Sequence, residues 1–260
     1  MIESKHCPDQ RLRSELTLKD SIGWGPSEGA LLIQELLRLH GINVILDGDL
    51  GPATSLGLAK FCVNNGGFSK GDLVTQVLVD RLAQPLLKVA AAASKAGDLS
   101  QTVAATAKRH LVEHPIEIGG ANRGPWVRLY MNGSEGANFP WCAGFVTYIV
   151  RQAAEAHNID PPISRTFSCD DIGAEAKSKA NMAFPRASLT DVSPGSIFLV
   201  PHITNSNDWI HTGIVLDSDF STSPNVLQTI EGNTNDNGSR EGFEVCQRYR
   251  AFDKVDIVII

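Results

Sequence analysis

The sequence lacks any apolar run long enough to cross a membrane. Its longest apolar stretches, Leu86–Ala93 and Ile257–Ile260, are far shorter than the ~20 residues that a span needs. The first residues have no apolar core and no cleavage-site pattern, which predicts synthesis without a secretory signal peptide. No basic block stands out and the net charge is −6, which argues against a nucleic-acid binder. We therefore expect a chain that is made soluble in the cytoplasm, with neither membrane nor nucleic acid as partner.

The five cysteines contain no C-x-x-C pair: they are Cys7, Cys62, Cys142, Cys169 and Cys246. This scatter argues against a zinc ribbon and against a disulfide framework, and the odd number leaves at least one free thiol unless it pairs with another chain. Hydrophobic residues make up 42% and charged residues 20%, which is ordinary globular composition and excludes a disordered, collagen-like or coiled-coil chain. No cofactor is predicted.

The first part of the chain predicts a small all-α domain. We expect an N-terminal tail over residues 1–20, three helices within residues 21–90 and a linker over residues 91–104, which is rich in Ala, Ser and Gly. The apolar spacing places the helices at residues 28–40, 53–64 and 74–87. A turn with glycines and a proline, Asp47–Pro52, joins the first two.

The second part, residues 105–260, predicts helices followed by strands. Helical patterns cover residues 102–113, 127–131 and 141–157, and a looser segment follows over residues 160–188. The expected strands are Ser196–Val200, Thr212–Asp217, Val226–Glu231, Glu244–Arg250 and Val255–Ile260. Helices first and antiparallel strands afterwards are typical of an α+β domain.

One cysteine has a context that favours a reactive thiolate. Cys142 follows Pro140 at the start of an apolar helix, where the helix dipole favours an anion by ~0.3–1 kcal/mol. That is too little alone, so a base is needed. His211 opens an apolar strand, and Glu231 and Asn233 alternate at the end of the next strand, where either could orient the imidazole.

A simpler interpretation exists for each of these residues. A cysteine on an apolar helix is more often a small buried hydrophobe, and a strand-end histidine more often has a structural role. Cys62 and Cys246 lie in apolar patterns and are expected in the core, and Cys7 lies in the expected tail. Neighbouring acids should hinder ionisation of Cys169.

Three runs taken together resemble the CHAP family, the cysteine, histidine-dependent amidohydrolases/peptidases related to papain. They are Pro140-Trp141-Cys142-Ala143-Gly144-Phe145-Val146, His211-Thr212-Gly213-Ile214-Val215 and Ile230-Glu231-Gly232-Asn233-Thr234. Residues 119–125 resemble the segment often found before that cysteine. The resemblance covers roughly residues 105–260 and implies a papain-like α+β fold, with N-terminal helices packed on an antiparallel sheet.

The resemblance implies a hydrolase that cleaves amide bonds in bacterial peptidoglycan. The bond is either the N-acetylmuramoyl-L-alanine amide or one within the peptide stem or cross-bridge. Carried over, Cys142 is the nucleophile, His211 the general base and then acid, and Glu231 orients His211, with Asn233 as the second candidate. The backbone N–H of Cys142 would help to stabilise the oxyanion.

The N-terminal helices resemble a peptidoglycan-binding three-helix domain. The matching residues are Ile33-Gln34-Glu35-Leu36-Leu37, Asp47-Gly48-Asp49-Leu50-Gly51-Pro52-Ala53-Thr54 and Ala59-Lys60-Phe61. The sequence departs from the family at Cys62, where glutamine is common. The loop's glycines and proline would serve a turn whether or not it binds anything.

We expect a monomer that acts on the cell wall or in the periplasm. It would arrive there by release, as a phage lysin, or by delivery, as a secreted toxin; a toxin would have an inhibitory or immunity protein as partner. Two rival readings remain. His110, Glu113 and His114 fit a zinc pattern, H-x-x-E-H, with both histidines on one helical face. The chain could also be a non-catalytic wall-binding protein.

Overall fold

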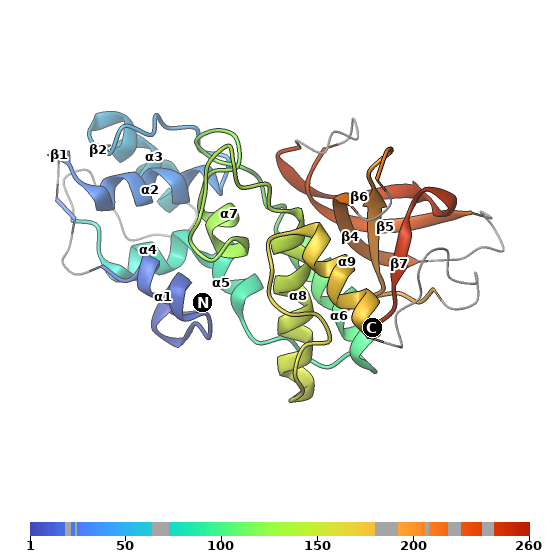
Figure 1. Cartoon of the computed structure of the whole chain (residues 1–260). Helices are drawn as coiled ribbons and strands as arrows, with labels where there is room; N and C mark the ends of the chain where they lie inside the picture. The colour runs from blue at the N-terminus through green and yellow to red at the C-terminus, as the bar shows by residue number, and fades with distance from the viewer. Residues whose placement is uncertain are drawn as a thin grey trace. The chain divides into compact units, whose positions relative to one another are not determined.

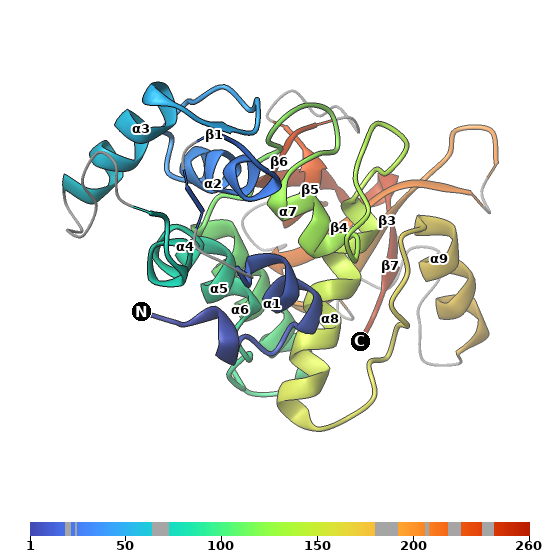
Figure 2. The ribbon, with the colours of Figure 1, turned by 90° about the vertical axis from the view of Figure 1, so that its left-hand side faces the viewer.

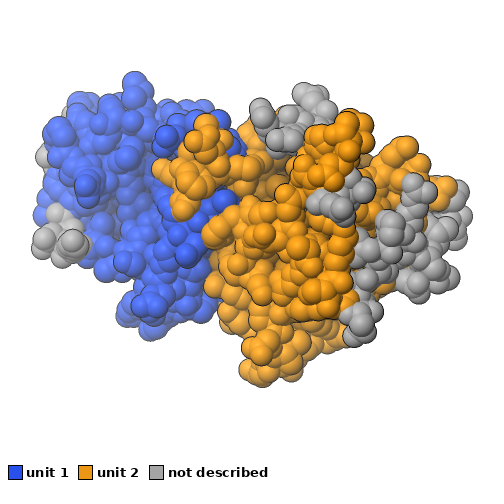
Figure 3. Space-filling model, viewed as in Figure 1, with its two compact units in different colours: residues 1–91, 117–133 blue, residues 92–116, 134–260 orange. Residues whose placement is uncertain are grey.

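The computed structural model divides the chain into two compact units. The first comprises residues 1–91 and 117–133, and the second comprises residues 92–116 and 134–260 (Figure 3). The residues that the structure describes are 1–18, 22–23, 25–63, 73–179, 192–205, 208–217, 225–235 and 242–260. The ends of three expected segments, at residues 19–20, at residue 64 and at residues 180–188, lie outside this set.

The first unit is helical (Figures 1 and 2). Its elements are η1 (Ser4–His6), α1 (Gln10–Leu16), β1 (Gly25–Pro26), α2 (Glu28–Arg38), β2 (Asp49–Leu50), α3 (Pro52–Val63), α4 (Gln76–Leu82), α5 (Gln84–Ala90) and α7 (Pro125–Tyr130). The first two predicted helices correspond to α2 and α3. The third is split into α4 and α5, because Pro85 has no backbone N–H and is accepted only in the first turn of a new helix.

Residues expected to form a tail are instead folded. The side chain of Asp9 accepts a hydrogen bond from the backbone N–H of Leu12 and so caps α1. Leu12 and Leu16 of α1 are fully buried, as is nearly all of Cys7. The sequence pattern over this short helix was too brief to predict it, and burial of its apolar face stabilises it.

The loop between α2 and α3 is held by one buried side chain. Gln34 donates from Nε2 to Asp47 Oδ1 at 2.6 Å and to the carbonyl of Asp49 at 3.0 Å. Its Oε1 accepts the backbone N–H of Gly48 at 2.9 Å. A single amide therefore satisfies both sides of the turn, which accounts for the loop's fixed shape without any ligand.

Residues 117–133 belong to the first unit, although the sequence suggested the catalytic part. Arg128 of α7 donates from Nε to Glu15 at 2.9 Å and from its terminal nitrogen to Glu35 at 2.6 Å. All three side chains are mostly buried, so removing one partner would leave an uncompensated charge. This charge cluster connects α1, α2 and α7 and explains why the segment groups with them.

The second unit is α+β, as predicted. Its helices are α6 (Leu99–Val112), α8 (Cys142–His157) and α9 (Cys169–Ser178), and η2 (Phe252–Lys254) is a short 3₁₀ turn. Its strands are β3 (Ile197–Pro201), β4 (Trp209–Asp217), β5 (Val226–Thr234), β6 (Glu244–Ala251) and β7 (Asp256–Val258). All neighbours in the sheet are antiparallel, in the order β6-β5-β4-β3-β7.

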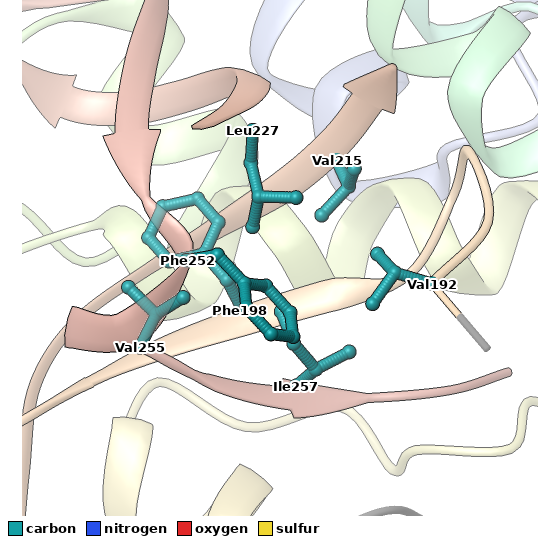
Figure 4. Packing of buried hydrophobic residues seen from close by; sticks show 7 residues of the cluster. All are labelled: Val192, Phe198, Val215, Leu227, Phe252, Val255 and Ile257. Carbon is teal, nitrogen blue, oxygen red and sulfur yellow. The ribbon is translucent and has the colours of Figure 1, made fainter. Parts of the chain in front are cut away.

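Helices cover the strands that carry the candidate residues. α8 packs against β4 and β5, α6 packs against α8, and α9 packs against β4 (Figure 1). A cluster of buried side chains takes one residue from each of four strands, Phe198, Val215, Leu227 and Ile257, and is completed by residues from η2 and the neighbouring loops (Figure 4). This packing ties β3, β4, β5 and β7 together into one rigid sheet.

Two boundaries differ from those that the sequence predicted. Asp98 and Gln101 form a capping box, so α6 begins at Leu99, inside the expected linker. The segment expected to be loose contains α9, which Ser168 caps by accepting the N–H of Asp171.

None of the described helices has both the length and the apolar character that crossing a membrane requires.

Candidate active site

Cys142 is the first residue of α8. A proline is accepted only in the first turn of a helix, so a helix that contains the following residues cannot begin well before Pro140. A long run of buried residues follows Cys142 and continues the helix. The backbone N–H of Ala143 points at the Cys142 sulfur. Unsatisfied N–H groups in the first helical turn favour a thiolate over a thiol. The sequence predicted this placement correctly.

His211 lies in β4 and faces Glu231 of β5. Its Nε2–H donates to Glu231 Oε2 over 2.8 Å. Because this bond occupies Nε2, Nδ1 is the ring nitrogen left to exchange a proton with the thiol. Nδ1 is buried and makes no hydrogen bond of standard geometry within the described part of the chain. The arrangement matches a thiol, a base and a residue that orients the base.

Two residues that sequence reasoning missed hold Glu231. Arg250 of β6 donates from Nε to Glu231 Oε1 at 2.8 Å and from its terminal nitrogen to Oε2. The hydroxyl of Thr229 donates to Oε1 at 2.7 Å. The register pairs Thr229 with Arg248, so Thr229, Glu231 and the alternate residue Arg250 share one face of the sheet. Strand alternation in the sequence could have placed Thr229 and Glu231 on one face. It could not have found Arg250, because the pairing of β5 with β6 does not follow from the sequence pattern.

The three groups shift one another's ionisation. Burial alone would lower the pKa of His211, but the neighbouring Cys142 thiolate and the hydrogen bond and charge of Glu231 raise it to about 9. Burial would raise the pKa of Glu231, whereas Arg250 and His211 lower it to about 2. A hydrogen bond from Cys169 and the charge of His211 outweigh burial and hold the pKa of Cys142 well below its usual range. The site therefore favours a thiolate–imidazolium pair.

The exposed fractions are small throughout the site. They are 5% for Cys142, 3% for His211, 0% for Glu231 and 1% for Asn233. Such burial strengthens the attraction between the charges, since little water screens them. Glu231 and His211 are in hydrogen-bond contact, and the described residues leave only a small part of Cys142 accessible.

Asn233 does not orient His211 in this structure; Glu231 does. The regular β5–β6 pairing is interrupted between Glu231 and Thr234, and Asn233 has a positive φ of 56°. This β-bulge interrupts the strand alternation that would have placed Asn233 on the same face as Glu231. Asparagine suits this backbone better than most residues.

Two glycines allow the elements of the site to approach closely. A Cβ on Gly232 would lie 2.8 Å from carbon atoms of Phe145 and Trp141, at the start of α8. A Cβ on Gly213 would lie 2.5 Å from Phe198 and 2.9 Å from Glu231. Gly232 therefore lets β5 lie against the start of α8, and Gly213 leaves room for Phe198 and Glu231 beside β4.

The structure places a second cysteine beside the first. The sulfur atoms of Cys142 and Cys169 lie 3.7 Å apart. Cys169 is the first residue of α9, so two helix N-termini meet at the pair. No sequence pattern links the two cysteines, because their positions are 27 apart and the intervening segment was expected to be loose.

The two histidines of the zinc-like pattern do not share a helical face. α6 ends at Val112, and His114 lies beyond it with a φ of 47°. His110 is fully buried and bonds Gln152 over 3.0 Å, whereas His114 bonds Glu244 over 2.7 Å. Burial lowers the pKa of His110 to about 3. Among the described residues, no three His, Cys, Asp or Glu side chains come together as a metal site.

Comparisons with known proteins add no relative. No protein-family model, no curated protein and no solved structure matched the chain. The geometry of the site and the sequence motifs are therefore the evidence for a function.

The shifted ionisation predicts how fast Cys142 is alkylated at each pH. An ordinary thiol loses reactivity with iodoacetamide about tenfold for each pH unit below its pKa of about 8.5. Cys142 should keep its rate constant from pH 9 into the acid range, because its pKa lies well below the usual value. The rate would be measured by mass spectrometry of the peptide that contains Cys142. A His211→Ala chain, in which the hydrogen bond from Cys169 still favours the thiolate, should show a steeper fall than the unsubstituted chain. A tenfold fall for each pH unit in the unsubstituted chain would contradict the thiolate assignment.

Proposed function

We propose that this chain is a thiol-dependent amidohydrolase that acts on bacterial peptidoglycan, as its resemblance to the CHAP family implies. The observation that carries the proposal is the buried row of Cys142, His211 and Glu231, in which Glu231 accepts the Nε2–H of His211 over 2.8 Å. A papain-like fold for the second unit is part of the proposal. The α+β order and the antiparallel sheet behind α8 support it.

The proposed reaction is acyl transfer through Cys142. The thiolate attacks the amide carbonyl carbon, and the oxygen gains a negative charge near the free N–H groups at the start of α8. The His211 imidazolium then gives its proton to the departing amine, which leaves a thioester on Cys142. Neutral His211 next takes a proton from water, whose oxygen attacks the thioester. The carboxylic acid leaves, and the thiolate–imidazolium pair is restored.

The first unit is proposed to bind the cell wall. Its α2–loop–α3 segment supports this through the resemblance of Asp47–Thr54 to peptidoglycan-binding domains, and Gln34 gives that loop a fixed shape. A wall-binding unit joined to a hydrolase would raise the local concentration of substrate. Whether the enzyme would be an amidase or an endopeptidase depends on which bond the second unit accepts.

The test is digestion of purified peptidoglycan sacculi with the full chain, followed by mass spectrometry of the released fragments. We expect soluble fragments with one new amino terminus for each bond cut. Cleavage between the lactyl group and the stem peptide would identify an amidase. A new amino terminus within the peptides would identify an endopeptidase. Either result supports the proposal.

Two treatments separate the proposal from its rivals. Prior alkylation with iodoacetamide should abolish release, and EDTA should not change it. Loss with EDTA but not with iodoacetamide would overturn the thiol mechanism in favour of a metal hydrolase. No release from the sacculi of any wall type, together with retained sedimentation on sacculi, would overturn hydrolysis in favour of a binding protein.

A further inference from the structure

The proposed nucleophile has a thiol as its immediate neighbour. Cys142 Sγ and Cys169 Sγ lie 3.7 Å apart, within van der Waals contact. A disulfide bond needs about 2.0 Å between the sulfur atoms, so the two must move closer before the bond can form. Neither cysteine forms a disulfide bond in this structure, and both lie at the start of a helix. The mechanism proposed above makes no use of Cys169.

Cys169 is held at this distance by contacts from α8. Arg165 donates to the carbonyl of Gly144 and to the hydroxyl of Thr147. Thr147 in turn donates to the carbonyl of Thr166 at 2.9 Å. These bonds fix the chain just before Cys169 along the first turns of α8, where Cys142 begins.

A second set of contacts joins α9 to the strand that carries His211. Asp170 Oδ1 accepts the backbone N–H of Trp209 at 2.7 Å, and the Asp171 carboxylate accepts the Thr166 hydroxyl at 2.7 Å. The two acids next to Cys169 are thus engaged by other groups. Cys169 is therefore fixed relative to both α8 and β4.

We propose that Cys142 and Cys169 form a redox-active dithiol, in which a hydroperoxide oxidises Cys142 and Cys169 closes a reversible disulfide that switches the enzyme off. The switch regulates the proposed active site, so its effect on hydrolysis rests on the proposed function. Formation of the disulfide itself does not. Hydrogen peroxide is small enough to reach a sulfur of which little is exposed.

The first step oxidises Cys142. Its thiolate attacks one oxygen of hydrogen peroxide: an S–O bond forms, the O–O bond breaks, and the departing hydroxide takes the proton of the His211 imidazolium to become water. Sulfur loses two electrons and the peroxide gains them. The product is a sulfenic acid on Cys142 beside a neutral His211.

The second step closes the disulfide. The Cys169 sulfur attacks the sulfur of the sulfenic acid, the S–S bond forms and the S–O bond breaks. The hydroxide leaves with the thiol proton of Cys169 as water. A reduced dithiol later restores both thiols by exchange. Without a neighbouring thiol, the sulfenic acid would be oxidised further to a sulfinic acid, which thiols do not reduce.

The test detects the disulfide directly. The folded full chain would be treated with hydrogen peroxide, its remaining thiols blocked with N-ethylmaleimide, and the protein digested with trypsin. Cys142 lies in the tryptic peptide of residues 129–151 and Cys169 in that of residues 166–177. We expect a linked pair of these peptides, a loss of hydrolysis in proportion to the linked fraction, and recovery of activity with dithiothreitol.

Two variants provide the comparison. Cys169→Ser should give no linked pair, and peroxide should inactivate it in a way that dithiothreitol does not reverse. Cys246→Ser removes another thiol of the second unit and should leave the linked pair unchanged. If Cys169→Ser fails to fold, the linked pair in the unsubstituted chain still decides the matter.

The outcomes keep the two proposals apart. Oxidation of Cys142 without the linked pair would overturn the dithiol, as would equal recovery of the unsubstituted chain and Cys169→Ser. A linked pair in a chain that releases nothing from sacculi would support the dithiol and contradict the hydrolase. Hydrolysis without a linked pair would support the hydrolase and contradict the dithiol.

Discussion

Replacing Cys142 with alanine is expected to reduce the release of peptidoglycan fragments by roughly 10³-fold or more, to the level without enzyme. The change removes the sulfur atom that bonds to the acyl group in the proposed mechanism. Without it no thioester can form, and the remaining groups of the site cannot carry out acyl transfer. Dye release from labelled sacculi, followed over time, measures the rate. Binding of the substituted chain to sacculi should persist, because the proposed wall-binding residues lie in the first unit.

Cys7→Ala is the matched control. Cys7 is also a buried cysteine, with 1% exposed, but it lies between η1 and α1 in the first unit. The control should keep the rate of hydrolysis and lose at most about 1–2 kcal/mol of stability through the small cavity it creates. Retention of more than a tenth of the activity by Cys142→Ala would contradict its role as nucleophile.

The sequence was sufficient for those features of the second unit that depend on local pattern. The apolar run after Pro140 predicted α8 with Cys142 at its start, and alternation predicted the strands that carry His211 and Glu231. The order of helices before strands predicted the α+β class. These features are encoded within a few residues, which is the range over which periodicity operates.

Contacts between distant segments were not predictable in the same way. Arg250 bonds Glu231 only because β6 pairs with β5 in this register, and Cys169 meets Cys142 only because Arg165 fixes its segment on α8. The choice between Glu231 and Asn233 depended on a β-bulge, which alternation alone does not reveal. Likewise, Arg128 draws residues 117–133 into the first unit through Glu15 and Glu35.

The candidate site is a row of alternating charges. A thiolate on Cys142, an imidazolium on His211, a carboxylate on Glu231 and a guanidinium on Arg250 sum to zero. Each inner member has an opposite charge on both sides, which offsets the cost of burying it. Removing one charge from this row should therefore destabilise the neighbouring charges more than removing one charge from an exposed ion pair would.

Glu231→Gln tests this row at its centre. The substitution keeps the size of the side chain but removes the charge that faces both His211 and Arg250. We expect kcat to fall by about 10²–10⁴-fold, because the imidazolium is no longer stabilised or oriented. The carboxylate raises the pKa of His211, so its loss should lower that pKa. The upper limb of the pH–rate profile, near pH 9 in the unsubstituted chain, should move to lower pH.

Stability should also fall, by about 1–3 kcal/mol in urea denaturation. A fully buried pair would lose ~3–5 kcal/mol, but the Arg250 side chain is 21% exposed and water compensates part of its charge. Asn233→Gly is the matched control, since glycine accepts the positive φ of 56° at that position. It should lower stability and leave the upper limb of the pH profile in place. The reverse pattern, with a shifted limb in Asn233→Gly and none in Glu231→Gln, would transfer the orienting role to Asn233.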